Sequence, residues 1–183
     1  MDFDHIKATE CPVPEDSAIR SLMADTDYED SFYLRVKDKK PDPLALVKYF
    51  FLSTPPWFNT LMQIREKLAR LVGLKTAFLT QSEFNRQLET FQGVKGETLA
   101  LFKTCYCDDQ EIVFEGKDKH LDFYFSFKID PDQVETGIFL STTVSYNNVI
   151  GPLYFFPVRF IHRIAIPKIM NRMMKKFFSQ KNF

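Results

Sequence analysis

The stretch HLDFYFSFKI, residues 120–129, alternates between polar and apolar side chains along its whole length. Successive side chains of a β-strand point to opposite faces, so this pattern predicts a strand with one buried face. Its other face, which carries His120 and Asp122, is expected to point outward. The face expected to point inward carries Leu121, Phe123, Phe125, Phe127 and Ile129.

Further strand-like segments lie on both sides of this stretch. Residues 97–106, 111–115 and 137–148 are separated from it and from one another by short turns rich in Asp and Gly, which is typical of antiparallel hairpins. Residues 31–37 predict an earlier strand, and residues 75–80 a short one. The sequence therefore indicates an antiparallel sheet at the centre of the fold.

Two helices are expected between the first strand and the later ones. Asp42 and Pro43 are typical of an N-cap and a first helical position. A Pro-Pro pair then separates this helix from a second one over residues 57–73. Residues 81–89 predict a short helix or a structured insert.

A long helical pattern begins at Gly151, with bends expected at Pro157 and Pro167. The stripe expected to face the sheet recurs at spacings of three and four and consists of Leu153, Phe156, Phe160 and Ile164. A strand, two helices, antiparallel strands and a long last helix make an α+β fold, in which a curved sheet wraps around that helix.

Composition sets limits on the class of protein. The 183 residues fit one domain, expected over 31–178, after an acidic, weakly ordered lead-in over 1–30 and before a tail over 179–183. The 24 basic and 24 acidic side chains balance, which argues against a nucleic-acid binder held by bulk charge. Phe is the outlier at 20 residues, and favours a Phe-lined interior or an apolar binding surface.

The His and Cys residues lack metal-ligand spacing, so neither a metal nor a cofactor is expected. No leader or membrane-spanning segment is recognised, so a cytoplasmic location is expected.

A set of short motifs carries a family resemblance. In chain order they are PLAL (43–46), PW (56–57), GL (73–74), DKHLDF (118–123), TTVSYNN (142–148), GPLY (151–154) and FPVRFIHR (156–163). This ordered set resembles the bacterial family known as domain of unknown function 2867. The element order is similar to the helix-grip fold of the START-like, polyketide-cyclase-like (SRPBCC) superfamily. The resemblance implies a cavity between the concave sheet face and the long helix, but no established reaction. Two departures stand out: residues 78–94 are longer than expected, and five or six strands are counted where seven are usual.

The resemblance implies which residues line such a cavity. Arg65 is a candidate to reach a carboxylate inside it, or else a surface residue with a buried stem. A mostly apolar wall with a few polar groups suits a small ligand, but the same rings would also suit a closed core. The candidate lining is Phe123, Phe125, Phe127, Leu140 and Thr142 from the sheet, Phe156 and Phe160 from the helix, and Trp57 near the helix corner.

His162 and Asp122 are the candidate acid–base residues. The alternation of 120–129 places Asp122 on the outer face beside His120, where a surface ion pair or a dimer contact is the alternative. His162 lies two positions past Phe160, at the margin of the buried stripe. There it either supports the structure or orients and acts on a ligand.

Charge along the chain adds one more expectation. After Glu135 there are seven basic residues and no acidic one. A basic, Phe- and Met-rich end is suited to contact with an anionic membrane, or simply offsets the acidic N-terminal part.

These features favour a protein that binds an apolar small molecule (a lipid, isoprenoid, polyketide or aromatic metabolite) without necessarily being an enzyme. The absence of a nucleophile elbow or a phosphate-binding loop agrees with this expectation. The alternatives are a cyclase- or hydratase-like enzyme that uses His162, and an interaction or membrane-surface adaptor that uses the C-terminal helix. A homodimer is also left open.

Overall fold

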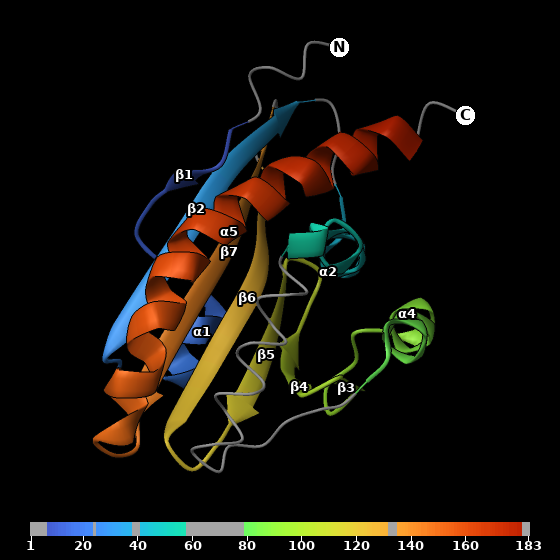
Figure 1. Cartoon of the computed structure of the whole chain (residues 1–183). Helices are drawn as coiled ribbons and strands as arrows, with labels where there is room; N and C mark the ends of the chain where they lie inside the picture. Colours follow the sequence, from blue (N-terminus) through green and yellow to red (C-terminus); the bar gives the residue numbers. More distant parts are fainter. Residues whose placement is uncertain (1–6, 24, 38–40, 58–78, 132–134, 181–183) are drawn as a thin grey trace.

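The computed structural model describes residues 7–23, 25–37, 41–57, 79–131 and 135–180. Seven strands form one antiparallel sheet in the order β1-β2-β7-β6-β5-β4-β3 (Figure 1). The strands are β1 (Thr9–Glu10), β2 (Tyr28–Lys37), β3 (Thr98–Leu99), β4 (Phe102–Cys107), β5 (Glu111–Lys117), β6 (Leu121–Pro131) and β7 (Glu135–Tyr146). The helices are α1 (Ala18–Leu22), α2 (Pro43–Leu52), α4 (Gln81–Thr90) and α5 (Ile150–Gln180).

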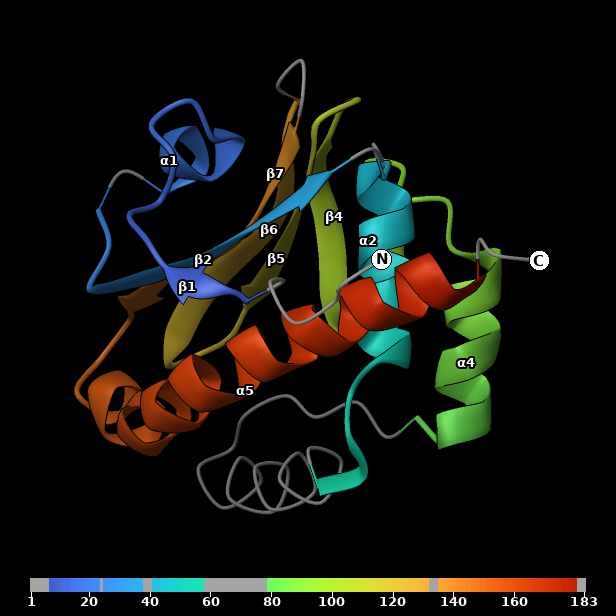
Figure 2. The same cartoon turned by 90° about the horizontal axis from the view of Figure 1, so that it is seen from above.

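The sheet is curved and open, and α5 crosses its concave face beside α2. The short helix α1 lies on the opposite, convex face (Figure 2). Pro157 and Pro167 stand inside α5 without ending it. A curved antiparallel sheet around a long C-terminal helix is the predicted helix-grip arrangement, so the α+β fold class is confirmed.

Two of the seven strands, β1 and β3, were not expected as separate strands, and both are short ones at the edges of the sheet. β1 pairs with β2 through Thr9 and Tyr33. β3 is separated from β4 because Ala100 has a φ of 55°, which interrupts the expected strand over 97–106. The backbone N–H of Ala100 donates instead to Oε1 of Gln87, at 3.1 Å. The sequence therefore located the central strands, joined β3 to β4 in one expected strand and missed β1.

The helical predictions have different outcomes. α2 begins as expected, because Asp42 accepts a hydrogen bond from the N–H of Ala45 and Pro43 is its first residue. Residues 81–89 form most of α4, which begins with a capping box between Thr80 and Glu83. The expected helix over 57–73 and the expected strand over 75–80 lie almost entirely outside the described residues.

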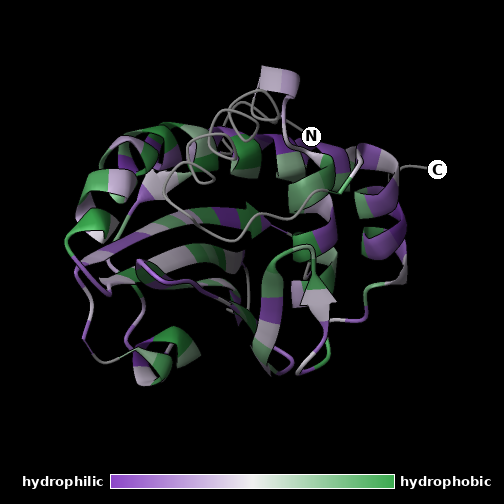
Figure 3. Cartoon of the chain, turned by 60° about the horizontal axis from the view of Figure 1, so that its bottom comes forward, coloured by the Kyte–Doolittle hydropathy of each residue, from purple (hydrophilic) through white to green (hydrophobic). Residues whose placement is uncertain are grey.

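The main core fills the space between the concave face, α5 and α2. Ile169, Met170 and Met173 of α5 are fully buried against the sheet. Phe32 of β2 and Leu140 of β7 are paired residues on the sheet side of this core. In Figure 3 hydrophilic and hydrophobic residues alternate along the strands, as expected for a sheet whose two faces differ.

The convex face differs from its expectation, because it is buried as well. His120, expected to be outside, is 2% exposed, and Tyr124, Ser126 and Lys128 are also buried. Two segments account for this burial. The first turn of α5 approaches so closely that a Cβ on Gly151 would lie 2.5 Å from the carbonyl oxygen of His120. The segment with β1 and α1 covers the middle of the face, and Val13 and Ile19 pack there against Val113 and Tyr124. Residues 9–22, expected to belong to a weakly ordered lead-in, thus hold a strand, a helix and part of a second core.

Candidate functional site

A cluster of Phe rings covers the β4–β6 side of the concave face. Phe114 and Phe125 stack with centroids 4.8 Å apart and ring planes 15° apart, and Phe127 follows along β6 at 6.1 Å from Phe125. Gly116, which pairs with Phe123, makes room for that ring, because a Cβ there would lie 2.2 Å from it. This Phe cluster consists of Phe50, Phe51, Phe84, Phe91, Phe102, Phe114, Phe123, Phe125 and Phe127.

The Phe cluster is closed at one end and open at the other. Phe91, Phe114 and Phe127 are fully buried. In contrast, Phe123 and Phe125 are only partly buried, as are Phe51, Phe84 and Phe102. The cluster therefore combines a packed core with an apolar wall that is not fully covered.

Beside this wall, the concave face carries a buried carboxylate. Asp30 of β2 has a side chain that is 1% exposed, and its Oδ2 lies 2.8 Å from Nδ1 of His162 on α5. The same oxygen accepts a hydrogen bond from the hydroxyl of Tyr28, at 2.7 Å. Burial, followed by the nearby charge and hydrogen bond of Asp30, raises the pKa of Tyr28 well above its ordinary value. Tyr28 thus stays protonated and remains a donor to Asp30.

Two buried oxygens of this region have no hydrogen-bond partner among the residues that the structure describes. They are Oδ1 of Asp30 and Oγ1 of Thr142. Asp30 pairs with Thr142 across β2 and β7, and Thr142 pairs with Phe125 across β7 and β6. One row of the concave face therefore runs from a carboxylate through a hydroxyl to the partly covered wall of the Phe cluster. Buried polar atoms are almost always paired, so these two oxygens are exceptions on the concave face.

The His162–Asp30 pair also defines a chemical capability. Nδ1 of His162 and Oδ2 of Asp30 lie within hydrogen-bond distance, at 2.8 Å, so the carboxylate engages one of the two ring nitrogens. This fixes the ring and directs Nε2 elsewhere. Among the described residues, Nε2 has no hydrogen-bond partner. A His oriented in this way is suited to hydrogen bonding with a ligand or to proton transfer.

The structure brings together five of the predicted lining residues and separates others from them. Phe123, Phe125, Phe127, Leu140 and Thr142 share the concave face, and His162 reaches it from α5.

Phe156 and Phe160 point away from the sheet and are 55% and 51% exposed, so they lie apart from this lining. Trp57 is 45% exposed, and Arg65 lies outside the described residues. Asp122 is on the convex side, where its Oδ1 accepts a hydrogen bond from Nδ2 of Asn147 at 3.1 Å. It is therefore apart from His162.

Sequence reasoning missed Tyr28 and Asp30, because both were assigned to the acidic lead-in. The signal was nevertheless present. Tyr28 and Asp30 continue backward the alternation of Phe32, Leu34 and Val36, and β2 begins at Tyr28 rather than at Ser31.

Other kinds of site find no support in the described part of the chain. No group of His, Cys, Asp or Glu residues there is arranged to hold a metal ion. Likewise, none of its helices is both long enough and apolar enough to span a membrane. The three Cys residues are free thiols, and burial raises the pKa of Cys105 to about 11, so that thiol is protonated at neutral pH.

The fold and the site define an α+β protein with a sheet that grips a long helix and a polar pair beside a Phe-lined wall. The chain belongs to a family described as protein of unknown function (DUF2867), whose model matches residues 22–169. This range includes Tyr28, Asp30, Thr142 and His162, whereas β1 and most of α1 precede it. No curated protein matches the chain.

Proposed function

We propose that the chain binds an apolar small molecule that carries a hydrogen-bond donor, held between the concave face and α5. The observation that carries this proposal is the row Asp30–Thr142–Phe125, in which two unpaired buried oxygens adjoin a partly covered aromatic wall. In such a site the apolar body of the ligand packs on the rings, and its donor group satisfies the oxygens.

The helix-grip arrangement supports placing the chain in the START-like SRPBCC superfamily, in which the resemblance described above implies a cavity at this position. The ligand class follows from the wall and the polar row together. A lipid, isoprenoid, polyketide or aromatic metabolite with a hydroxyl or amine group satisfies both.

Native mass spectrometry of the purified protein, with extraction of anything that co-purifies, tests this proposal directly. We expect an apolar molecule with at least one donor group at near-stoichiometric level. If the protein is obtained free of ligand, uptake of the neutral fluorophore N-phenyl-1-naphthylamine is measured instead.

Variants distinguish this site from other apolar surfaces. Phe125→Trp enlarges a ring of the wall and is expected to reduce uptake of the fluorophore about tenfold or more without unfolding the chain. Phe160→Trp makes the same change on the exposed side of α5 and is the matched control. Equal uptake by both variants would argue against a site on the concave face.

An acid–base enzyme of the cyclase or hydratase type is the second candidate, favoured by the 2.8 Å contact between His162 and Asp30. In this proposal Nε2 of His162 transfers the proton, and Asp30 fixes the ring. His162→Gln and Asp30→Asn should each lower conversion of the extracted molecule by about 100-fold or more while binding persists. Asp122→Asn, on the convex side, should leave conversion unchanged. Turnover that survives His162→Gln would exclude this role.

A further inference from the structure

The side of α5 that faces away from the sheet is apolar over its first four turns. Leu153 is 76% exposed, Phe156 55%, Phe160 51% and Ile164 58%. These four residues recur at spacings of three and four and form one stripe, here called the outer face of α5. They are the residues expected to face the sheet. The sheet instead receives the opposite side of the helix, which carries Phe155, His162, Ala165 and Ile169.

Basic side chains accompany this outer face. The guanidinium of Arg159 lies 4.7 Å from the ring centroid of Phe156 and 4.9 Å from that of Phe160. Lys168 and Lys175 are exposed and continue the same side of the helix beyond Ile164. Arg163 instead forms an ion pair with Glu10 of β1. No acidic residue occurs anywhere in α5.

We infer that the outer face of α5 is a docking surface for an anionic lipid membrane. Four exposed apolar side chains on one side of a helix, followed by exposed Lys residues, match the pattern of a helix that lies in the headgroup region with its apolar side inserted. The positive charge of α5 complements anionic lipid headgroups. Arg159 stacks along the two rings, so its charge sits beside the inserted side chains.

Charge also argues against self-association as the explanation of this exposed face. Two copies that met through their outer faces would bring Arg159, Lys168 and Lys175 of each copy together, with no acidic residue of α5 to offset them. A membrane rich in anionic lipid supplies the opposite charge as well as an apolar interior.

Membrane docking goes beyond the proposed ligand binding and does not depend on it. His162 projects from the other side of the same helix. Docking through the outer face would therefore place the helix that covers the candidate site directly on lipid.

The test measures binding of the full chain to vesicles by flotation. Vesicles of phosphatidylcholine with phosphatidylserine at about 3:1 are compared with vesicles of phosphatidylcholine alone. We expect binding to the anionic vesicles only, and a fall of about tenfold or more in the partition coefficient as the salt rises from about 0.05 to 0.5 M.

Two double variants and two controls assign the binding to this face. The pair Phe156→Ser and Phe160→Ser is expected to lower partition about tenfold or more, and the pair Lys168→Glu and Lys175→Glu by a similar factor. The controls are two single variants in the exposed turn before β3. Val94→Ser removes one apolar side chain and Lys95→Glu reverses one charge, and both should leave partition unchanged. Circular dichroism checks that each variant is folded.

Three results would overturn the inference. The first is no binding to anionic vesicles, and the second is equal binding to both kinds of vesicle. The third is a concentration-dependent dimer of the wild-type chain that the Phe156 and Phe160 pair of changes abolishes, because it would assign the face to a second copy.

Discussion

The concave face of the sheet packs Phe rings against α5 and α2, whereas the convex face buries hydroxyls, a carboxylate and an ammonium group beneath residues 9–22. Across the convex face, Ser31, Ser141 and Ser126 form one row that continues into Val113, and all four residues are fully buried. Small side chains in this row allow the covering segment to lie close to the sheet. Both faces are therefore buried. Large rings fill the space above the concave face, and the covering segment lies close to the small side chains of the convex face.

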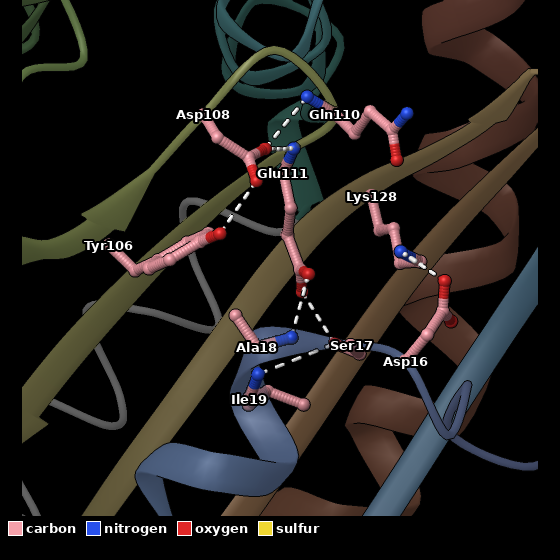
Figure 4. A network of polar contacts seen from close by, with 9 residues as sticks. All are labelled: Asp16, Ser17, Ala18, Ile19, Tyr106, Asp108, Gln110, Glu111 and Lys128. Atoms are coloured by element: carbon pink, nitrogen blue, oxygen red, sulfur yellow. Dashed lines mark hydrogen bonds and ion pairs between the residues drawn. The ribbon is translucent and has the colours of Figure 1, made fainter.

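Polar contacts fix the position of the covering segment on the convex face (Figure 4). The carboxylate of Glu111 accepts hydrogen bonds from the hydroxyl of Ser17 at 2.5 Å and from the N–H of Ala18 at 2.9 Å. Nζ of Lys128 lies 3.0 Å from the carboxylate of Asp16. Net hydrogen-bond energies are modest, but a broken buried contact is costly. These contacts therefore determine where α1 sits more than they add to total stability.

Adjacent residues of β6 provide the sharpest test of this comparison. Phe127 is fully buried on the concave face among Phe50, Phe114 and Phe125, and Ser126 is fully buried on the convex face. Phe127→Ala should lower the free energy of unfolding by about 3–5 kcal/mol, because it removes a ring and leaves a cavity.

Ser126→Ala is the matched substitution on the other face. The Oγ atom of Ser126 has no hydrogen-bond partner within the described part of the chain, so its removal should change stability by less than about 0.5 kcal/mol or increase it. Urea unfolding of both variants measures the difference. A loss above about 2 kcal/mol in Ser126→Ala would show that the convex hydroxyls stabilise the fold as strongly as the rings do.

The alternation of residues 120–129 was enough to predict β6 and the identity of its Phe face, because side-chain direction in a strand has a period of two. It did not predict exposure, because a polar face is also buried when another segment supplies partners, as Asp16 does for Lys128. The stripe of α5 was assigned to the wrong side for a related reason. The helix is apolar on both sides, and periodicity alone does not say which side meets the sheet.

The candidate site was predicted in part, because its Phe rings, Thr142 and His162 were singled out from the sequence but Asp30, the partner of His162, was not. Phe125 and Thr142 lie in regular strands, and the alternation of those strands assigned them to one face. Asp30 pairs with His162 across 132 residues of sequence, and no local pattern encodes such a contact. The contact arises from the register of β2 on β7 and from the rotation of α5 about its axis, both of which are set by tertiary packing.

Glu111→Gln tests the contacts by which Glu111 holds Ser17 and Ala18 on the convex face. Its effect on stability should be intermediate. The amide keeps the shape but replaces one acceptor oxygen by a donor, so either Ser17 or Ala18 loses its buried acceptor. We expect a loss of about 1–3 kcal/mol, together with faster amide hydrogen exchange in α1.

Glu29→Gln is the control for this change. Its carboxylate lies 3.4 Å from Arg20 in an ion pair in which both side chains are 40% exposed, so the loss should be a few tenths of a kcal/mol. If both substitutions cost the same and exchange in α1 is unchanged, Glu111 does not hold α1 in place.

Asp108 marks the solvent end of the network in Figure 4 and should give the smallest effect. Partial burial acts to raise its pKa, but hydrogen bonds from the Tyr106 hydroxyl and from the N–H groups of Gln110 and Glu111 outweigh burial, so the pKa lies below its ordinary value. A carboxyl with a lowered pKa in the folded state stabilises the fold above its unfolded pKa, and this contribution is lost as the pH falls through the folded value.

Wild type should therefore exceed Asp108→Asn in stability at about pH 6 by roughly 0.5 kcal/mol after allowance for solvent screening, and this advantage should shrink toward about pH 3. Urea unfolding of both proteins at the two pH values measures the difference. If the stability advantage of wild type over Asp108→Asn grows as the pH falls, burial controls the pKa of Asp108, as burial dominates deeper in the convex face. The boundary between the buried polar network and the solvent would then lie beyond the β4–β5 turn.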